Sequence, residues 1–327
     1  MMPLRLLRLP AKMSEFENSL CRHSRESGNL VNEKHWMAVP RNSPLARFPA
    51  FAGMTAVFAM FGVVQLAIAA EIALPRPDHI VILVEENRGY SKIIGNADAP
   101  YINTLAQRGV LFTHSYGVTH PSQPNYLALF SGTTRGISSN ACPLELKGEN
   151  LGGALIEKGL SFVSYSESLP EAGYEGCRYG AYMRKHNPAA NWKELAASNQ
   201  PFTAFPQDFS KLPTVSLVVP DQRNDMHDGS IEQGDVWLAQ NIEQYAKWAM
   251  TNNSLLIVTF DEDDGREGNR IATIFVGEMV KPGKSAQHIN HYTLLRTLSE
   301  MYGLSILGES KDQQPITGVW KKTGKKR

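Results

Sequence analysis

The sequence has 327 residues, of which 42% are hydrophobic and 20% are charged, and its formal net charge at pH 7 is +1. This length and composition are typical of a globular protein with enough apolar residues for a full core. The balanced charge excludes a protein that binds nucleic acid through its overall charge, and we expect no nucleic-acid partner. Composition leaves the oligomeric state open.

The first 70 residues are not expected to belong to the folded domain. Residues 54–70, MTAVFAMFGVVQLAIAA, carry no charge and end in small residues, with Ala67 and Ala69 placed for cleavage. Seventeen residues are few for a membrane span and typical of a signal peptide, although a single uncleaved anchor is the alternative. We interpret residues 1–53 as a doubtful leader from a misassigned start. The expected location is therefore periplasmic or secreted.

Strands and helices alternate after the leader. Strands are expected over residues 79–86, 110–117, 161–168, 214–220, 254–262 and 270–278, and helices over 99–109, 151–159, 235–250, 291–303 and a segment that Ser122 opens. Residues 79–86, HIVILVEE, form a continuous apolar run of the kind found in buried parallel strands. The pattern predicts an α/β fold with a mostly parallel central sheet flanked by helices.

One domain is expected over residues 71–310, followed by a basic tail over 311–327. Five of the last seven residues, KKTGKKR, are positively charged, which indicates a solvated tail or one with weak attraction to an anionic surface. Within the domain, Cys142 and Cys177 are an even pair. In an exported chain they favour a disulfide, and two buried free thiols are the alternative.

Four of the expected strands end in polar groups, and two of these ends are acidic. The first strand leads into Glu85, Glu86, Asn87 and Arg88, and SLLIVTF leads into Asp261, Glu262, Asp263 and Asp264. The second strand leads through His120 to Ser122, and the strand over 214–220 leads into a loop with Asp225 and His227. Open α/β sheets bind ligands at this edge, and clustered carboxylates are unfavourable there without a cation. A polar turn is the alternative for DEDDG alone. The pattern predicts a divalent metal ion, either a hard cation on oxygen ligands or Zn or Fe with added histidines.

Ser122 lies between Pro121 and Pro124 in THPSQPNYL, directly before an apolar helix. A helix N-cap is the alternative explanation for such a serine. A metal and a helix N-terminus would together activate its hydroxyl, which predicts phosphoryl transfer through a phosphoserine. His186 and His227 are the candidate acids for the leaving alcohol, with surface positions as the alternative. Residues 277–285, GEMVKPGKS, lack the glycine spacing of a P-loop.

Six motifs occur in a recognisable order. They are VEENRGYSKIIG (84–95), THPSQPNYLALFSG (119–132), RKHNP (184–188), VVPDQRNDMHDGS (218–230), IVTFDEDDG (257–265) and NHYTLLRTLSEMYGL (290–304). Together they resemble the bacterial acid phosphatase and phospholipase C phosphoesterase family of the alkaline-phosphatase-like superfamily. The chain lacks the length of the phospholipase C branch, which favours the acid phosphatases and phosphatidylinositol-3-phosphatase-like proteins.

The resemblance implies a role for each matching residue. The implied metal ligands are Glu86, Asn87, Ser122, Asp261 and Glu262, and Ser122 is also the implied nucleophile. His186 and His227 are implied to lie around the phosphate. Asn125 and Lys185 are expected to bind substrate. Some members carry two aspartates where this chain has Asp261 and Glu262, so the longer Glu262 side chain is expected to reach the metal instead. His291 matches a recurring histidine whose role we cannot assign. The resemblance also supports a disulfide between Cys142 and Cys177.

The resulting hypothesis is an exported, metal-dependent phosphomonoesterase whose substrate is a phosphate monoester, a phospholipid or phosphoinositide being one candidate. A phospholipase C-type phosphodiesterase with the same site is the first alternative. A catalytically silent phosphate-binding protein is the second.

Overall fold

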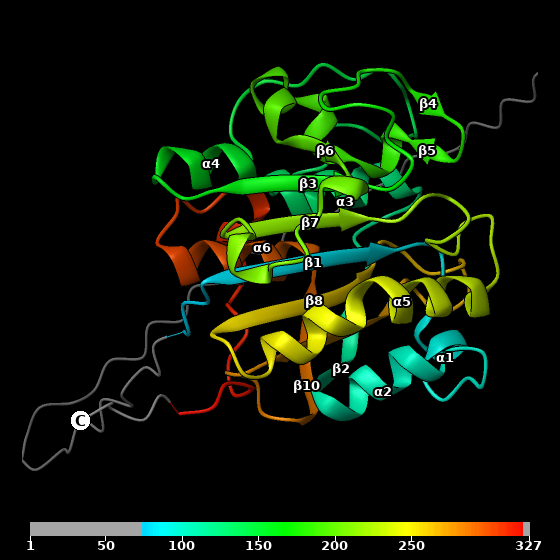
Figure 1. The fold of residues 1–327 in the computed structure, drawn as a ribbon, viewed down its shortest axis with the longest axis vertical. Coiled ribbons are helices and arrows are strands. Elements are labelled where there is room, and N and C mark those ends of the chain that lie inside the picture. The colour runs from blue at the N-terminus through cyan, green and yellow to red at the C-terminus, as the bar shows by residue number, and fades with distance from the viewer. Residues whose placement is uncertain (1–73, 323–327) are drawn as a thin grey trace, which may run out of the picture. The chain divides into compact units, whose positions relative to one another are not determined.

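The computed structural model describes residues 74–322, which fold around one eight-stranded sheet (Figure 1). Its order is β10 (Gly283–Asn290), β2 (Val110–Tyr116), β9 (Arg270–Gly277), β8 (Ser254–Phe260), β1 (His79–Glu85), β7 (Val215–Val219), β3 (Phe162–Ser166) and β6 (Asn199–Pro201). All neighbouring pairs are parallel except those of β9, which is antiparallel to β2 and β8. The predicted mostly parallel sheet is confirmed.

Strand β1 lies at the centre of the sheet, between β7 and β8. All but the first of its residues are buried, because helices cover both faces of the sheet at this point. A strand buried on both faces needs apolar side chains on both, which explains the unbroken run IVILV. Strand β8 has the same design and is buried along its whole length.

The helices form a layer on each face of the sheet (Figure 1). The buried side chains of α3 (Ser122–Ser131), α4 (Leu151–Glu157) and α6 (His291–Tyr302) pack in one core, and those of α1 (Tyr90–Ile93), α2 (Pro100–Arg108) and α5 (Ile231–Ala249) pack in the other. Helix α5 begins before the predicted residue 235, because the Ser230 side chain caps it by accepting a hydrogen bond from Gln233 N.

The loop-rich segment after β3 contains a short hairpin and several single turns. The hairpin consists of β4 (Arg178–Tyr179) and β5 (Tyr182–Met183). Turns of 3₁₀ helix lie at Arg184–His186, Pro188–Asn191, Lys193–Ser198, Phe202–Ala204 and Phe209–Lys211, with another later at Gly308–Asp312. A disulfide joins Cys142 to Cys177 next to the hairpin, as predicted.

Two features differ from the predicted elements. Strand β10 was not predicted, because its residues GKSAQHIN are mostly polar and it lies at the exposed edge of the sheet. The packed part of the chain also extends past residue 310, since Ile316 and Trp320 are buried in the core. The doubtful leader, the signal peptide and the last five residues lie outside the described residues.

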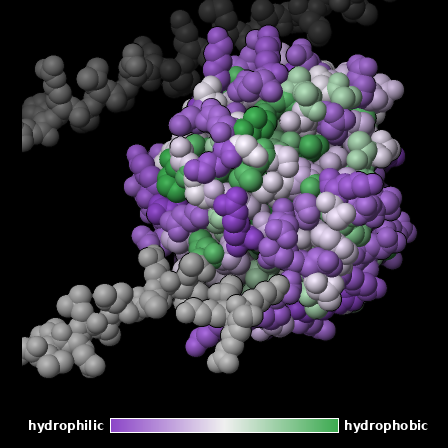
Figure 2. Space-filling model, turned by 60° about the vertical axis from the view of Figure 1, so that its left-hand side comes forward, coloured by the Kyte–Doolittle hydropathy of each residue, from purple (hydrophilic) through white to green (hydrophobic). Residues whose placement is uncertain are grey.

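Residues 74–322 contain no helix that is both long and apolar enough to cross a membrane. The face of the molecule in Figure 2 is mainly hydrophilic, with small and separate hydrophobic areas.

Candidate active site

The site residues meet at the carboxyl ends of β1 and β8. These strands are parallel and pair Glu85 with Phe260, so the residues that follow them emerge side by side. Glu86 and Asn87 therefore lie next to Asp261 and Glu262. This is the edge at which ligands bind in open α/β sheets.

Ser122 is the first residue of α3 and is 2% exposed. Pro121, not Ser122, occupies the N-cap position, and no side chain caps this helix. The Ser122 hydroxyl instead donates to two carboxylates, with Oγ 3.0 Å from Glu86 Oε2 and 3.2 Å from Glu262 Oε1. The capping explanation is therefore wrong, and the hydroxyl faces the acidic residues of both strands.

Backbone hydrogen bonds hold the second acidic strand end in place. Asn87 has a left-handed backbone (φ 52°), a conformation that asparagine tolerates, and its N–H donates to Asp261 Oδ1 over 3.0 Å. The N–H of Glu262 donates to the same oxygen over 2.6 Å. The other oxygen of Asp261, Oδ2, is buried without a hydrogen-bond partner. It is thus available to a cation.

Burial, and to a smaller extent neighbouring carboxylates, raises the pKa values of the carboxyl groups in this cluster. Burial first, then the charge of Glu262, raises the pKa of Asp261 to about 7. Burial, with a contribution from Asp263, raises the pKa of Glu262 to about 7. The pKa of Glu86 rises well above its usual value because of burial and the charges of Asp261 and Asp225. A divalent cation would offset this repulsion, and these oxygen donors fit one.

This cluster predicts a pH-dependent effect of Asp261→Asn on the metal-free protein. Because the Asp261 pKa exceeds its unfolded value of about 3.9, ionisation of this group destabilises the folded state as the pH rises from about 4 to about 7. With chelator present, Asp261→Asn should therefore unfold at a higher temperature than the native protein near pH 8. That advantage should shrink near pH 5.

Thermal unfolding with and without chelator tests this prediction. Added Mg²⁺ or Mn²⁺ should stabilise the native protein and have little effect on Asp261→Asn, because the variant lacks one anionic donor. A variant that is less stable than the metal-free native protein at both pH values would contradict the prediction.

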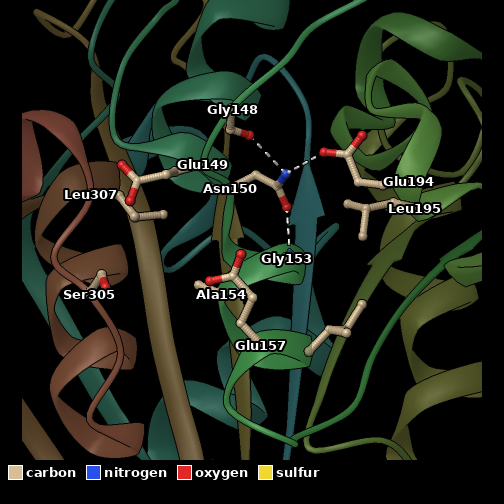
Figure 3. Close-up of a pocket in the computed structure, with 11 residues that line it drawn as sticks. Gly148, Glu149, Asn150, Gly153, Ala154, Glu157, Glu194, Leu195, Ser305 and Leu307 are labelled. Atoms are coloured by element: carbon tan, nitrogen blue, oxygen red, sulfur yellow. Dashed lines mark hydrogen bonds between the residues drawn. The ribbon is translucent and has the colours of Figure 1, made fainter.

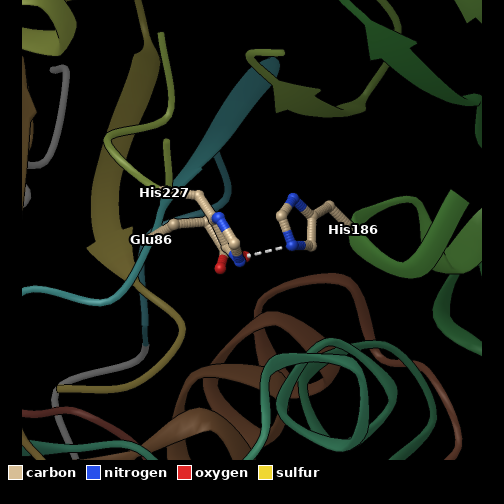
Figure 4. A group of neighbouring side chains, drawn as sticks. All are labelled: Glu86, His186 and His227. Atoms are coloured by element: carbon tan, nitrogen blue, oxygen red, sulfur yellow. Dashed lines mark ion pairs between the residues drawn. The ribbon is translucent and has the colours of Figure 1, made fainter. Parts of the chain in front are cut away.

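The side chains of His186 and His227 lie beside Glu86 (Figure 4). His186 Nε2 lies 3.1 Å from Glu86 Oε1, and Nδ1 lies 3.0 Å from Asp225 Oδ2. His227 Nε2 lies 3.0 Å from Lys185 Nζ. Ligand atoms of Glu86, His186 and His227 all lie within 4.8 Å of one another, so these three residues could also hold a metal ion. Both predicted histidines and Lys185 thus belong to the site.

Burial decides the charge of His186. The side chain is completely enclosed, and desolvation, followed by the charges of Lys185 and His227, holds its pKa well below the usual value. The imidazole is therefore neutral at pH 7. A neutral ring held by Asp225 suits a fixed position in the site better than a proton reservoir.

The Asn125 side chain lies at the site, and both ends of its amide form hydrogen bonds within the protein. Its Oδ1 accepts hydrogen bonds from Val118 N and Thr119 N, and its Nδ2 donates to Thr119 O over 2.8 Å and to Glu262 Oε2 over 3.2 Å. These bonds fix the loop before Ser122. Substrate binding by Asn125 stays a prediction.

Three more residues contact the acidic cluster or His186. Tyr126 donates its hydroxyl to Glu86 Oε1 over 2.7 Å, His120 Nδ1 lies 2.9 Å from Glu262 Oε2, and Asp225 contacts His186. The sequence placed His120 and Asp225 among the polar residues at this edge of the sheet, without a role for either, and did not single out Tyr126. Asp225 and His120 each lie two positions from a residue with a predicted role, which is the signal that could have given them one.

His291 supports the site from α6. Its Nε2 donates to the backbone oxygen of Asp261 over 2.6 Å, and its Nδ1 is buried without a partner. Burial lowers the pKa of His291 to about 4, so the ring is neutral at pH 7 and positions the Asp261 backbone. This contact supplies a structural role for a residue that the sequence left unassigned.

The loop that carries Asp225 and His227 is held by Met226. Met226 is fully buried with a left-handed backbone (φ 74°) and packs against Gly234 of α5. A Cβ at Gly234 would lie 2.5 Å from Met226 Cγ and 2.9 Å from Asn224 O. The absence of a side chain at Gly234 therefore allows the loop to reach the site.

Gly234→Ala should displace this loop. We expect a loss of about 1–3 kcal/mol in the free energy of unfolding from overpacking, and a fall of about 10-fold or more in kcat/KM from misplaced site groups. Gly153→Ala in α4 is the matched control, because its Cβ would have no neighbour closer than 3.4 Å. Equal effects of the two substitutions on activity would contradict a positioning role for the Met226–Gly234 contact.

A cavity of about 410 Å³ lies apart from these residues, at the start of α4 (Figure 3). Asn150 at its centre accepts from Gly153 N over 2.8 Å and donates to Gly148 O and Glu194 Oε1. Its amide is thus satisfied within the protein. The cavity contains none of the site residues, so the chemistry is assigned to the sheet edge.

Two solved structures align with this fold. A protein in the alkaline phosphatase superfamily from Vibrio parahaemolyticus aligns with a TM-score of 0.50 at 16% identity, over 75% of this chain and 71% of its own. A phosphonate monoester hydrolase from Silicibacter pomeroyi aligns with the same TM-score at 12% identity, over 70% and 74%. The chain therefore shares its fold with these two proteins.

The chain belongs to the Phosphoesterase family, whose model matches residues 96–305. It is 48% identical over 260 residues to the phosphatidylinositol-3-phosphatase of Mycobacterium tuberculosis, covering 78% of this chain and 87% of that protein. It is 30% identical to an acid phosphatase of Aspergillus fumigatus over 62% of this chain, and spans 51% of that relative's length. The chain is therefore a phosphoric ester hydrolase of the acid phosphatase type.

Proposed function

We propose that the chain is an exported, metal-dependent phosphomonoesterase that acts through a phosphorylated Ser122. The observation that carries this proposal is the position of the Ser122 hydroxyl. It is buried at the start of α3 and donates to carboxylates from two strand ends, Glu86 and Glu262. A serine that only stabilised its helix would cap it, which Ser122 does not do.

The proposed reaction has two steps. Ser122 Oγ forms a bond to phosphorus, the bond from phosphorus to the alcohol oxygen breaks, and the alcohol leaves with a proton. Water then attacks phosphorus and displaces Ser122, releasing inorganic phosphate. The N-terminus of α3 favours negative charge on both the serine oxygen and the phosphate.

The proposed metal ligands are Glu86, Asn87, Ser122, Asp261 and Glu262. A divalent cation there would favour the ionised serine and screen the phosphate from the carboxylates. Two observations support this ligand set: the unpartnered Asp261 Oδ2 and the raised pKa values of the cluster.

Lys185 and the two histidines are proposed to hold the phosphate and assist the leaving alcohol. Lys185 is buried next to His227 and supplies a positive charge beside the acidic cluster. His227 is partly exposed and paired with Asp228 over 2.7 Å, so it is the better placed of the two for proton exchange with solvent. His186 is proposed to assist from beside the phosphate, where its ring is held between Glu86 Oε1, 3.1 Å from Nε2, and Asp225 Oδ2, 3.0 Å from Nδ1.

A phosphoinositide monoester is the proposed substrate class. The 48% identity to a phosphatidylinositol-3-phosphatase over most of both chains supports it. The disulfide between Cys142 and Cys177 supports an exported location, because such bonds persist outside the cytoplasm.

Hydrolysis of p-nitrophenyl phosphate beside bis(p-nitrophenyl) phosphate tests the reaction type. We expect turnover of the monoester that is lost with chelator and restored by a divalent metal. Turnover of the diester alone would support the phosphodiesterase alternative. Tight phosphate binding without turnover of the monoester, the diester or a phosphoinositide would support the phosphate-binding alternative.

A further inference from the structure

The Tyr126 hydroxyl bonds to one carboxylate of the acidic cluster. Tyr126 lies one helical turn after Ser122 on α3, so the two side chains are on the same face of the helix. It is 1% exposed, and its hydroxyl donates to Glu86 Oε1 over 2.7 Å. A phenol is protonated at neutral pH, so this hydroxyl is a hydrogen-bond donor there. Tyr126 therefore contacts a proposed metal ligand directly.

The two oxygens of the Glu86 carboxylate have different partners. Oε1 accepts the hydrogen bond from Tyr126 and lies 3.1 Å from His186 Nε2. Oε2 accepts from Ser122 Oγ over 3.0 Å and from Asn87 Nδ2 over 3.3 Å. Ser122 and Asn87 are both proposed metal ligands. Oε2 is therefore the oxygen beside the ligand set, and Oε1 lies on the side of Tyr126 and His186.

A glutamate without a fixed donor can present its oxygens to a cation in several ways. Its last side-chain torsion is broad, and carboxylates bind cations through one oxygen or through both. A hydrogen bond to an ionised oxygen is about twice as strong as one between neutral groups, so rotation of the Glu86 carboxylate away from Tyr126 is unfavourable. The hydroxyl thus occupies Oε1 and leaves Oε2 to the ligand set.

Packing fixes the position of the donor itself. The Tyr126 ring stacks on that of His186, with centroids 5.4 Å apart and an interplanar angle of 14°, and it belongs to the core that α3, α4 and α6 share with the sheet. In the same turn of α3, Asn125 Nδ2 donates to Glu262 Oε2 over 3.2 Å. The start of α3 therefore contacts both acidic strand ends. A donor locked by packing holds its acceptor within a narrow range of positions.

We propose that Tyr126 is a positioning residue for the metal site, whose hydroxyl holds Glu86 Oε1 so that Oε2 is presented to the divalent cation beside Ser122 and Asn87. The inference rests on the proposed function, since it takes these residues as metal ligands. Hydrogen-bond partners of ligating carboxylates orient them, and loss of such a partner typically costs about 10–100-fold in metal affinity or activity.

Mn²⁺ binding to the purified protein, followed through the electron paramagnetic resonance signal of the free ion, tests the proposal. Tyr126→Phe removes the hydroxyl and keeps the ring that stacks on His186. We expect its Kd for Mn²⁺ to rise about 10–100-fold. Tyr302→Phe is the matched control, because Tyr302 is also 1% exposed and its hydroxyl donates to Pro77 O over 3.0 Å, outside the acidic cluster. This control should keep the native Kd.

Hydrolysis of p-nitrophenyl phosphate at limiting and saturating Mn²⁺ supplies a second measurement. The kcat of Tyr126→Phe should be low at limiting Mn²⁺ and recover to within about threefold of the native value in excess, because the variant keeps every proposed ligand. Its KM for the substrate should stay within about twofold of the native value. A loss of kcat that excess Mn²⁺ does not recover would contradict a role in presenting Glu86 to the metal.

The binding data separate this inference from the proposed metal site. A native Kd for Tyr126→Phe, or an equal rise in Tyr302→Phe, would overturn the inference and leave the metal site in place. Tighter binding by Tyr126→Phe would also overturn it, because the cation would then use Oε1 with His186 and His227. If the native protein binds neither Mn²⁺ nor, by calorimetry, Ca²⁺ or Zn²⁺, the inference and the proposed metal site both fail.

Discussion

Replacement of Ser122 by alanine should lower kcat for p-nitrophenyl phosphate by about three to five orders of magnitude. The substitution removes the attacking oxygen together with one donor to the metal. The fold should persist, because Ser122 bonds to carboxylates and not to its own helix. Steady-state hydrolysis and thermal unfolding measure the two effects separately.

Ser131→Ala is the control for this substitution. Ser131 is also a buried serine of α3, and its hydroxyl donates to Leu127 O over 2.9 Å at the far end of the helix. Its loss should affect stability and leave kcat nearly unchanged. A fall of less than about tenfold in the kcat of Ser122→Ala would rule out Ser122 as the nucleophile.

The second large effect is expected for His186→Ala, with a loss of about 10²–10⁴-fold in kcat/KM. His186 contacts both Glu86 and Asp225, and its depressed pKa keeps the ring neutral at pH 7. If the ring acts as a neutral contact, the pH profile of the residual activity should keep the same shape as that of the native enzyme.

His288→Ala is the matched control, because His288 is exposed and stacks on Tyr116 with ring centroids 4.7 Å apart, outside the acidic cluster. Its activity should equal that of the native protein. Disappearance of one limb of the pH profile in His186→Ala would show instead that this histidine transfers the proton.

The acidic half of the site could be predicted because it depends on regular structure. HIVILVEE and SLLIVTFDE are both apolar runs that end in acids, and two parallel strands place such ends at one edge of a sheet. Pattern and topology therefore place both acidic strand ends at one edge, and the family resemblance selects Glu86, Asn87, Asp261 and Glu262 among their residues. Ser122 follows for a similar reason, since it begins the helix after β2.

The histidine half could not be predicted in detail because it depends on loop conformation. Asp225 reaches His186 only because Met226 adopts a left-handed backbone and packs under α5 at Gly234. This contact produces no periodic pattern of apolar residues in the sequence. Strand β10 was not predicted for a related reason. Its own residues are mostly polar, and it is stabilised by pairing with β2, which its sequence does not indicate.

The central claim is that Ser122 carries the phosphoryl group between the two steps. Rapid acid quenching during hydrolysis of p-nitrophenyl phosphate, followed by mass spectrometry of the peptide that contains Ser122, tests it most directly. The account predicts one phosphoryl group on Ser122, absent from chelated enzyme and from Ser122→Ala. Sustained turnover with Ser122 unmodified and the phosphoryl group on another residue, such as His186 or His227, would contradict it.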